Sequence, residues 1–208
     1  MVRVAITGGI ACGKSTVLQM FADLPHVAVL SADAIVHQLY LPGETVHNRV
    51  VAEFGRAILD PGGRIDRKKL ADEAFRAPER RQKLESIVHP AVSAHEVKWM
   101  DHIAASSPET NLAVIEVPLL FEAKSEGNFA KTIAVTSTAE KKLARYKSKH
   151  PELSEAEAGA ELERRSASQL PDAEKAGRAD FVVDNSGTMD ATRAQVKKIY
   201  QQLTPQLT

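Results

Sequence analysis

The feature that most restricts the fold of this chain is Gly8-Gly9-Ile10-Ala11-Cys12-Gly13-Lys14-Ser15, which fits the pattern G-x-x-x-x-G-K-[ST]. It lies between an apolar stretch at 2–6 and a stretch of helical character that begins near Lys14. This context of strand, glycine-rich turn and helix is the one the pattern requires. Glycines let successive backbone N–H groups point inward and hold phosphate oxygens, and the helix N-terminus adds the positive end of its dipole. The segment therefore predicts a phosphate-binding loop.

Two side chains of the loop have predicted roles in holding a nucleoside triphosphate. Lys14 is expected to reach the β- and γ-phosphates, and the Ser15 hydroxyl is expected to bind Mg²⁺. The alternative is a plain glycine turn before a helix. Cys12 is interpreted as a tolerated small residue, the alternative being a redox-sensing thiol whose pKa the helix N-terminus lowers. The predicted nucleotide-binding residues of the segment are Gly8, Gly9, Ile10, Ala11, Cys12, Gly13, Lys14, Ser15 and Thr16.

The rest of the chain predicts an α/β fold of the P-loop NTPase type. The segments that read as strands are 2–6, 26–30, 112–117, 131–135 and 180–183. They are nearly continuous in Val, Ile, Ala and Leu, which is typical of parallel strands covered on both faces. Helical stretches begin near Lys14, Asp33, Asp66, Pro78, Thr138, Ser154 and Met189. Alternating strands and helices favour a five-stranded parallel sheet flanked by helices.

Uneven spacing of the strands predicts two insertions in this core. Roughly eighty residues separate the second and third strands, far more than one crossover needs. We expect a nucleotide-binding core of 1–32, 110–137 and 170–208, with a helical acceptor-binding insertion at 33–109 and a helical lid at 138–169. The His89-Pro90 step is expected to end or kink the longest helix of the acceptor insertion, because proline lacks the N–H a helix needs.

Composition excludes several classes of partner and location. The chain has 27 Lys and Arg against 27 Asp and Glu, so it lacks the basic excess of a general nucleic-acid binder. No segment is apolar for the roughly 18 residues of a membrane span. A single cysteine cannot form an internal disulfide, and the apolar start of the chain is too short for a signal peptide, so we expect a cytoplasmic protein. The sequence leaves the oligomeric state open and permits a monomer.

A phosphate loop predicts a nucleotide but not a reaction, and two classes compete. A GTPase-type switch needs an N-K-x-D motif after a late strand, which this sequence lacks. The segment 60–63 matches D-x-x-G but lies in the helical insertion, so we interpret it as a turn. A phosphotransferase explains both insertions, because one would hold the acceptor while the other would close over the phosphates and exclude water.

Two carboxylates follow predicted strands and are candidates for chemistry. Asp33 comes directly after the second strand, and in a doubly wound sheet the carboxyl ends of the strands line the ligand crevice. It could orient or deprotonate an acceptor hydroxyl or hold metal-bound water, the alternative being a helix N-cap. Glu116 ends the third strand, where it could assist Mg²⁺ through water or serve only a structural role.

Segments spread over nearly the whole chain resemble, in their order, the dephospho-coenzyme A kinase family. The more specific ones combine Ile65-Asp66-Arg67, His89-Pro90, 117–122 and Arg165 with Gln169. The complete set is GGIACGKST, SADAI, FGRAILDPGGRIDRKKL, ESIVHPAV, VIEVPLLFEA, RRSASQ and ADFVVDNSG. The resemblance implies phosphorylation of the ribose 3′-hydroxyl of dephospho-coenzyme A with ATP and Mg²⁺, as the last step of coenzyme A synthesis.

The resemblance also implies roles for individual residues. Asp33 matches the presumed base at the acceptor hydroxyl, and Asn185 matches the turn beneath the adenine. Arg67 and His89 match motif positions of the acceptor domain, for which a surface role and a packing role are the respective alternatives. Arg145 and Arg165 fall where lid arginines would clamp transition-state charge.

The runner-up function is a related kinase acting on a nucleoside monophosphate or another small alcohol. A nucleotide-binding switch or assembly module with slow hydrolysis is the outside alternative.

Overall fold

The computed structural model describes residues 1–204, so 205–208, the end of the predicted core segment 170–208, lie outside the described residues. The chain divides into two compact units. We call 1–31 with 103–208 the core unit and 32–102 the inserted unit.

The core unit is built on a five-stranded parallel sheet in the order β2-β3-β1-β4-β5, which confirms the predicted fold class. Its register places Glu116 opposite both Ile6 of β1 and Ser31 of β2. Because all strands are parallel, their carboxyl ends meet at one edge of the sheet, where side chains far apart in sequence come together. The strands are β1 (Val2–Gly8), β2 (Val27–Ser31), β3 (Leu112–Glu116), β4 (Lys131–Thr136) and β5 (Phe181–Asp184).

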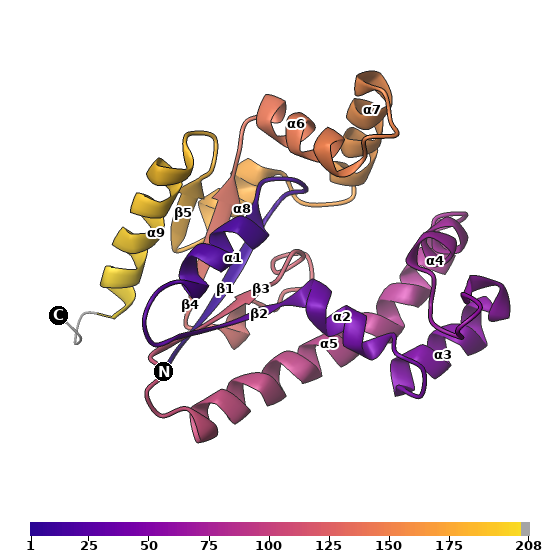
Figure 1. Cartoon of the computed structure of the whole chain (residues 1–208), viewed down its shortest axis with the longest axis horizontal. Helices are drawn as coiled ribbons and strands as arrows, with labels where there is room; N and C mark the ends of the chain where they lie inside the picture. The colour runs from indigo at the N-terminus through magenta and orange to yellow at the C-terminus, as the bar shows by residue number, and fades with distance from the viewer. Residues whose placement is uncertain (205–208) are drawn as a thin grey trace. The chain divides into compact units, whose positions relative to one another are not determined.

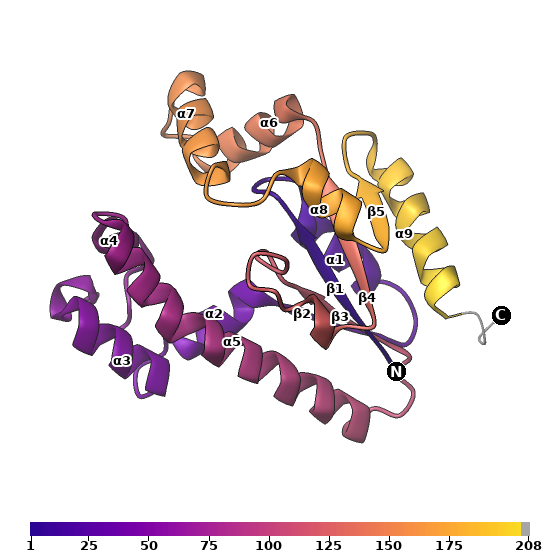
Figure 2. The same cartoon turned by 180° about the vertical axis from the view of Figure 1, so that it is seen from behind.

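The two faces of the sheet are covered by different helices (Figures 1 and 2). Helices α1 (Lys14–Ala22) and α9 (Met189–Leu203) pack on one face, where the strands present mainly Val, Ile and Leu. The short helix α8 (Asp172–Arg178) packs on the other face against β1 and β4. On the face covered by α8, the strands present small residues, including Ala5, Thr7 and Ala134. Small residues allow α8 to lie close to the sheet.

The inserted unit has a hydrophobic core of its own. Val50, Ile58 and Leu70 are among the buried residues of this cluster, and each comes from a different element. The elements are α2 (Ala32–Leu39), α3 (Thr45–Phe54), a 3₁₀ turn η1 (Arg56–Ile58), α4 (Arg67–Ala74) and α5 (Pro78–Ser106), whose last turn belongs to the core unit. Asp60 accepts hydrogen bonds from the backbone of Gly62 and Arg64, so the segment 60–63 is a turn, as predicted.

Helix α5 does not end at Pro90, which was the first of the two outcomes expected there. The helix runs through that residue from Pro78 to Ser106. A proline inside a helix removes one backbone hydrogen bond, but a 29-residue helix retains many others. Within residues 1–204, neither this helix nor any other combines the length and apolarity needed to cross a membrane.

Helices α6 (Ala139–Lys149) and α7 (Glu155–Ser166) fill the predicted lid segment. Thr138 caps α6, and Ser154 with Glu157 forms a capping box at the start of α7, so both helices begin where the sequence predicted. Tyr146 and Leu162 pack in a small apolar cluster with Ile10 and Ala11 of the phosphate loop. The helices therefore contact the loop through apolar side chains, while their action as a moving lid stays a prediction. A further 3₁₀ turn, η2 (Glu126–Asn128), precedes β4.

Candidate active site

The segment 8–15 forms a tight loop between β1 and α1, which we call the phosphate loop. Gly8 and Gly13 have φ angles of 146° and 97°, a region that favours glycine. A Cβ atom on Gly8 would collide with the Val135 carbonyl, and one on Gly13 would collide with the Asn185 amide nitrogen. Both glycines are therefore required by backbone conformation and by the close approach of a neighbour, which is β4 at Gly8 and the Asn185 side chain at Gly13.

Lys14 is the first residue of α1, and its side chain turns back over the phosphate loop. Its Nζ donates hydrogen bonds to the carbonyl oxygens of Gly8 at 3.1 Å and Gly9 at 2.9 Å. The ammonium group is thus held among the backbone atoms that the sequence predicts to surround phosphate oxygens.

Ser15 and Glu116 meet at the carboxyl edge of the sheet. The Ser15 hydroxyl donates to Glu116 Oε2 at 3.2 Å, and the Ser31 hydroxyl donates to the same oxygen at 3.4 Å. Glu116 is only 4% exposed. This position brings a carboxylate to the predicted metal ligand Ser15, while a role of Glu116 toward Mg²⁺ stays a prediction.

Arg145 and Asn185 support the phosphate loop through its carbonyl groups. The Arg145 guanidinium donates to the carbonyls of Cys12 at 3.1 Å and Asn185 at 2.7 Å. The buried Asn185 amide donates to the Cys12 carbonyl at 2.9 Å, and its oxygen accepts from the Thr192 hydroxyl at 3.0 Å. Both predicted residues therefore lie at the loop and contact its backbone directly.

The Cys12 side chain is fully buried, which argues against the redox-sensing alternative. Burial raises the pKa of this thiol and outweighs the nearby Lys14 ammonium, which lowers it. A reactive cysteine needs a lowered pKa and access to solvent. Cys12 therefore serves as a small packed residue of the phosphate loop.

Asp33 and Arg67 meet in the inserted unit. Asp33 is exposed and is the second residue of α2, so it is not the cap that precedes a helix. Arg67 Nη2 lies 3.4 Å from the Asp33 carbonyl oxygen, which brings together two of the predicted acceptor-site residues. His89 is exposed on α5, which argues against a packing role for its ring.

Arg165 lies on α7 and is paired within its own helix. Its Nε donates to Glu161 Oε1 at 2.9 Å, and the side chain is 40% exposed. Unlike Arg145, it makes no hydrogen bond to the phosphate loop within residues 1–204. Its role at the transferring phosphate therefore stays a prediction.

Sequence analysis missed several charged residues of the core unit. Lys142 of α6 is ion-paired with Asp172 of α8, whose carboxylate lies against Gly9 of the phosphate loop. Lys142 lies three positions before Arg145, so helical spacing places the two cations on one face of α6 and could have indicated both. The second missed pair, Lys175 with Glu122, carries no such local signal.

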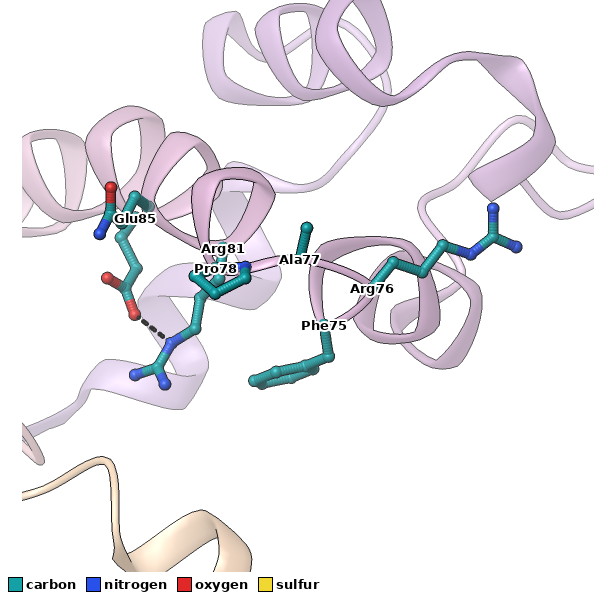
Figure 3. Close-up of a pocket in the computed structure, with 7 residues that line it drawn as sticks. Phe75, Arg76, Ala77, Pro78, Arg81 and Glu85 are labelled. Atoms are coloured by element: carbon teal, nitrogen blue, oxygen red, sulfur yellow. Dashed lines mark hydrogen bonds and ion pairs between the residues drawn. The ribbon is translucent and has the colours of Figure 1, made fainter.

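The inserted unit also contains a surface pocket of about 360 Å³ at the junction of α4 and α5 (Figure 3). The Arg81 guanidinium lies above the Phe75 ring and donates to Glu85 at 2.8 Å, so its charge is balanced locally. Neither Arg67 nor His89 lines this pocket. Its lining residues are Phe75, Arg76, Ala77, Pro78, Arg81, Gln82 and Glu85.

Strand order and loop together place this protein among the phosphate-loop kinases. A central β1 that leads into the phosphate loop, with a helical unit inserted after β2, is the plan of an enzyme that binds a nucleotide and a separate acceptor.

Comparison with known proteins identifies the kinase. The profile of the family described as Dephospho-CoA kinase matches residues 2–191, and the chain belongs to this family. Members phosphorylate dephospho-coenzyme A with ATP in the final step of coenzyme A synthesis, so the protein is an enzyme that transfers phosphate to a hydroxyl. The assignment decides against the nucleotide-binding switch.

Individual relatives cover nearly all of the chain. A dephospho-CoA kinase of Aquifex aeolicus is 41% identical over 204 residues, which are 98% of each chain. A crystal structure of a Thermus thermophilus protein is 31% identical with a TM-score of 0.75 and covers 98% of each chain. The dephospho-CoA kinase from Campylobacter jejuni is 26% identical with a TM-score of 0.60, covering 97% of this chain and 96% of its own.

Proposed function

We propose that this chain transfers the γ-phosphoryl group of ATP to the ribose 3′-hydroxyl of dephospho-coenzyme A, releasing coenzyme A and ADP. The observation that carries the proposal is the Ser15–Glu116 pair next to Lys14, which supplies a hydroxyl, a carboxylate and an ammonium group at the phosphate loop. Phosphoryl transfer needs mainly positioning and charge stabilisation from the protein, and these groups are suited to both.

The donor set fits Mg²⁺. Magnesium prefers oxygen ligands and is usually held by one or two carboxylates together with water and substrate phosphates. Ser15 and Glu116 would hold the ion, Ser15 through its hydroxyl and Glu116 directly or through water. When bound, Mg²⁺ would neutralise the β- and γ-phosphate oxygens.

Asp33 is the proposed general base. Its carboxylate would accept the proton of the acceptor hydroxyl, or orient that hydroxyl in line with the γ-phosphate. Arg67 would meet an anionic part of the acceptor, a role that its 3.4 Å contact with the Asp33 carbonyl supports. His89 would contact the acceptor from α5.

The arginines and Asn185 complete the proposed site. Asn185 and Arg145 would keep the phosphate loop in its nucleotide-binding shape and border the adenine. Arg165 would leave Glu161 to meet the transferring phosphate, a role for which the planar guanidinium is suited. We also propose a cytoplasmic location, which the free thiol of Cys12 supports.

The first experiment measures ADP release with a coupled assay. The reaction contains ATP, Mg²⁺ and one acceptor from a panel: dephospho-coenzyme A, AMP, CMP or adenosine. Turnover confined to dephospho-coenzyme A, with coenzyme A as the product, is expected. Fast turnover with AMP or CMP would support the runner-up, a nucleoside monophosphate kinase. ATP hydrolysis that is slow and needs no acceptor would overturn the proposal.

The base assignment is tested with Asp33→Asn. We expect kcat to fall by about 10²–10⁴, because general base catalysis contributes that much. Asp72→Asn is the matched control, since Asp72 is an exposed aspartate of the same unit. An Asp33→Asn enzyme that folds and keeps the kcat of the control would remove Asp33 from the reaction.

A further inference from the structure

Helix α8 carries a lysine whose side chain has no exposed surface. Lys175 is 0% exposed, and its Nζ donates to Glu122 Oε1 at 2.9 Å and to the Pro118 carbonyl at 3.0 Å. A buried charge is unfavourable unless it is paired and fully hydrogen-bonded. An apolar side chain would cover the sheet at this point without that cost, so the ion pair calls for an explanation beyond stability.

Glu122 is the partner of Lys175 and holds a second group. Its Oε1 also accepts a hydrogen bond from the Leu170 backbone N–H at 2.9 Å. Burial would raise the pKa of Glu122, but the bonds from Lys175 and Leu170 outweigh it and lower the pKa. The carboxylate is therefore charged at neutral pH. Leu170 is the first residue after the predicted lid, so Glu122 fixes the point where the chain returns from α7.

The Pro118 carbonyl links the ion pair to the phosphate loop. It accepts from the Thr7 hydroxyl at 3.3 Å as well as from Lys175. Thr7 is buried in β1 and directly precedes Gly8, and Pro118 lies two residues after Glu116. The ion pair thus joins the strand that leads into the loop, the segment after Glu116, and the end of the lid segment.

We propose that Glu122 is a positioning residue that sets the geometry of the lid's return to the core through its bond to Leu170, while Lys175 balances the buried charge of Glu122. The inference rests on the proposed function and on the predicted closure of α6 and α7 over the phosphates, which would exclude water. Toward the other end of the lid segment, Arg145 in the interior of α6 bonds to the Cys12 carbonyl of the loop. With both ends fixed, the two helices can approach the nucleotide only along a restricted path.

Two double variants separate this role from a structural one. In Glu122→Leu/Lys175→Met, apolar residues replace the pair and the acceptor for Leu170 is lost. In Glu122→Gln/Lys175→Met, the amide oxygen can still accept from Leu170, so this variant is the matched control. Replacing a buried ion pair with apolar residues often leaves stability unchanged, so both variants are expected to fold.

The informative readout is the ratio of acceptor-independent ATP hydrolysis to phosphoryl transfer. The Leu/Met variant is expected to raise this ratio and lower kcat, each by about tenfold, because a misplaced lid admits water. The Gln/Met control is expected to stay within about threefold of the wild type for both, since the backbone contact remains. Wild-type values for both quantities in the Leu/Met variant would overturn the proposal.

Hydrogen exchange of the wild-type protein provides a second test that needs neither a variant nor the acceptor substrate. The Leu170 amide is expected to exchange as slowly as the backbone amides of the sheet, with and without ATP. Exchange as fast as that of an exposed loop would show that Glu122 does not hold the chain there, and would equally overturn the proposal. If the wild type fails to phosphorylate dephospho-coenzyme A, the proposed function fails, while this measurement still decides the role of Glu122.

Discussion

The Ser15 hydroxyl and the Glu116 carboxylate lie 101 positions apart in sequence and 3.2 Å apart in space. The parallel register of β1 and β3 brings them together, because Glu116 pairs with Ile6, just before the phosphate loop. A buried carboxylate that accepts from two serine hydroxyls, Ser15 and Ser31, is fixed in orientation before any ligand arrives.

Replacing Glu116 with Gln is expected to weaken the binding of Mg²⁺. The amide keeps the shape and one acceptor oxygen but loses the charge that attracts the ion. We expect a fall in kcat of about 10²–10³ and a higher Mg²⁺ concentration at half-maximal rate. The measurement is initial rate against Mg²⁺ at saturating ATP. A variant with the wild-type Mg²⁺ curve would assign Glu116 a purely structural role.

Arg145 and Arg165 are expected to differ in what their loss changes. Arg145→Met removes donors to two carbonyls of the phosphate loop, so it should lower Tm without nucleotide and raise the KM for ATP. Arg165→Met removes only a partly exposed pair with Glu161, so Tm should hold while kcat falls. Thermal melts and initial rates, measured side by side for the two variants, test this expected difference in Tm, KM and kcat. A lower Tm for Arg165→Met alone would reverse the assignment.

Glu96 predicts a pH dependence of stability. It is 4% exposed on α5, and burial raises its pKa from 4.5 to about 7. Between these values the folded protein holds a proton that the unfolded chain has released, so this residue lowers the free energy of unfolding as pH rises through the window. Above pH 7 the folded protein bears the full free-energy cost of holding a charged carboxylate at this buried position.

Glu96→Gln should therefore stabilise the protein at pH 8 and not at pH 4.5. The expected gain at pH 8 is roughly 1–3 kcal/mol in the free energy of unfolding. Urea unfolding at the two pH values measures it. An equal gain at both would point to packing rather than ionisation as the cause.

Cys12 is expected to resist thiol reagents in the folded protein. The thiol is buried and its pKa is raised, so little thiolate is exposed at pH 8. Iodoacetamide labelling followed by mass spectrometry should detect modification only after unfolding. Labelling of the native protein as fast as of the unfolded one would show that the loop opens readily.

Local pattern was enough to predict the phosphate loop and the strands. The glycines of the loop and the unbroken apolar runs of Val, Ile and Ala are imposed by nearest neighbours, so they are visible in the sequence. Helix α8 was not predicted, because seven residues offer too little periodicity to recognise. The pairing of Lys175 with Glu122 was not predicted for a different reason, although Glu122 lies in the segment 117–122 that contributes to the resemblance. Their pairing depends on how α8 lies on the sheet, and no spacing along the chain encodes it.

Two further residues illustrate the limits of local rules. Pro90 signals a break in a helix, yet α5 continues through it. Asn185 was assigned by resemblance to the turn beneath the adenine, while its side chain is engaged with Cys12 and Thr192. The remaining hydrogen bonds of α5 carry the helix through Pro90, and the contact between Asn185 and Cys12 joins residues 173 positions apart, which no local pattern indicates.

The division of the chain has a consequence for how such enzymes can change. The inserted unit is one uninterrupted stretch, 32–102, with its own hydrophobic core. The strands and the loop that hold the nucleotide are encoded entirely outside it. Mutations that alter which alcohol is phosphorylated can thus accumulate in one continuous third of the gene. The residues that bind the phosphoryl donor lie in the rest of the gene and need not change.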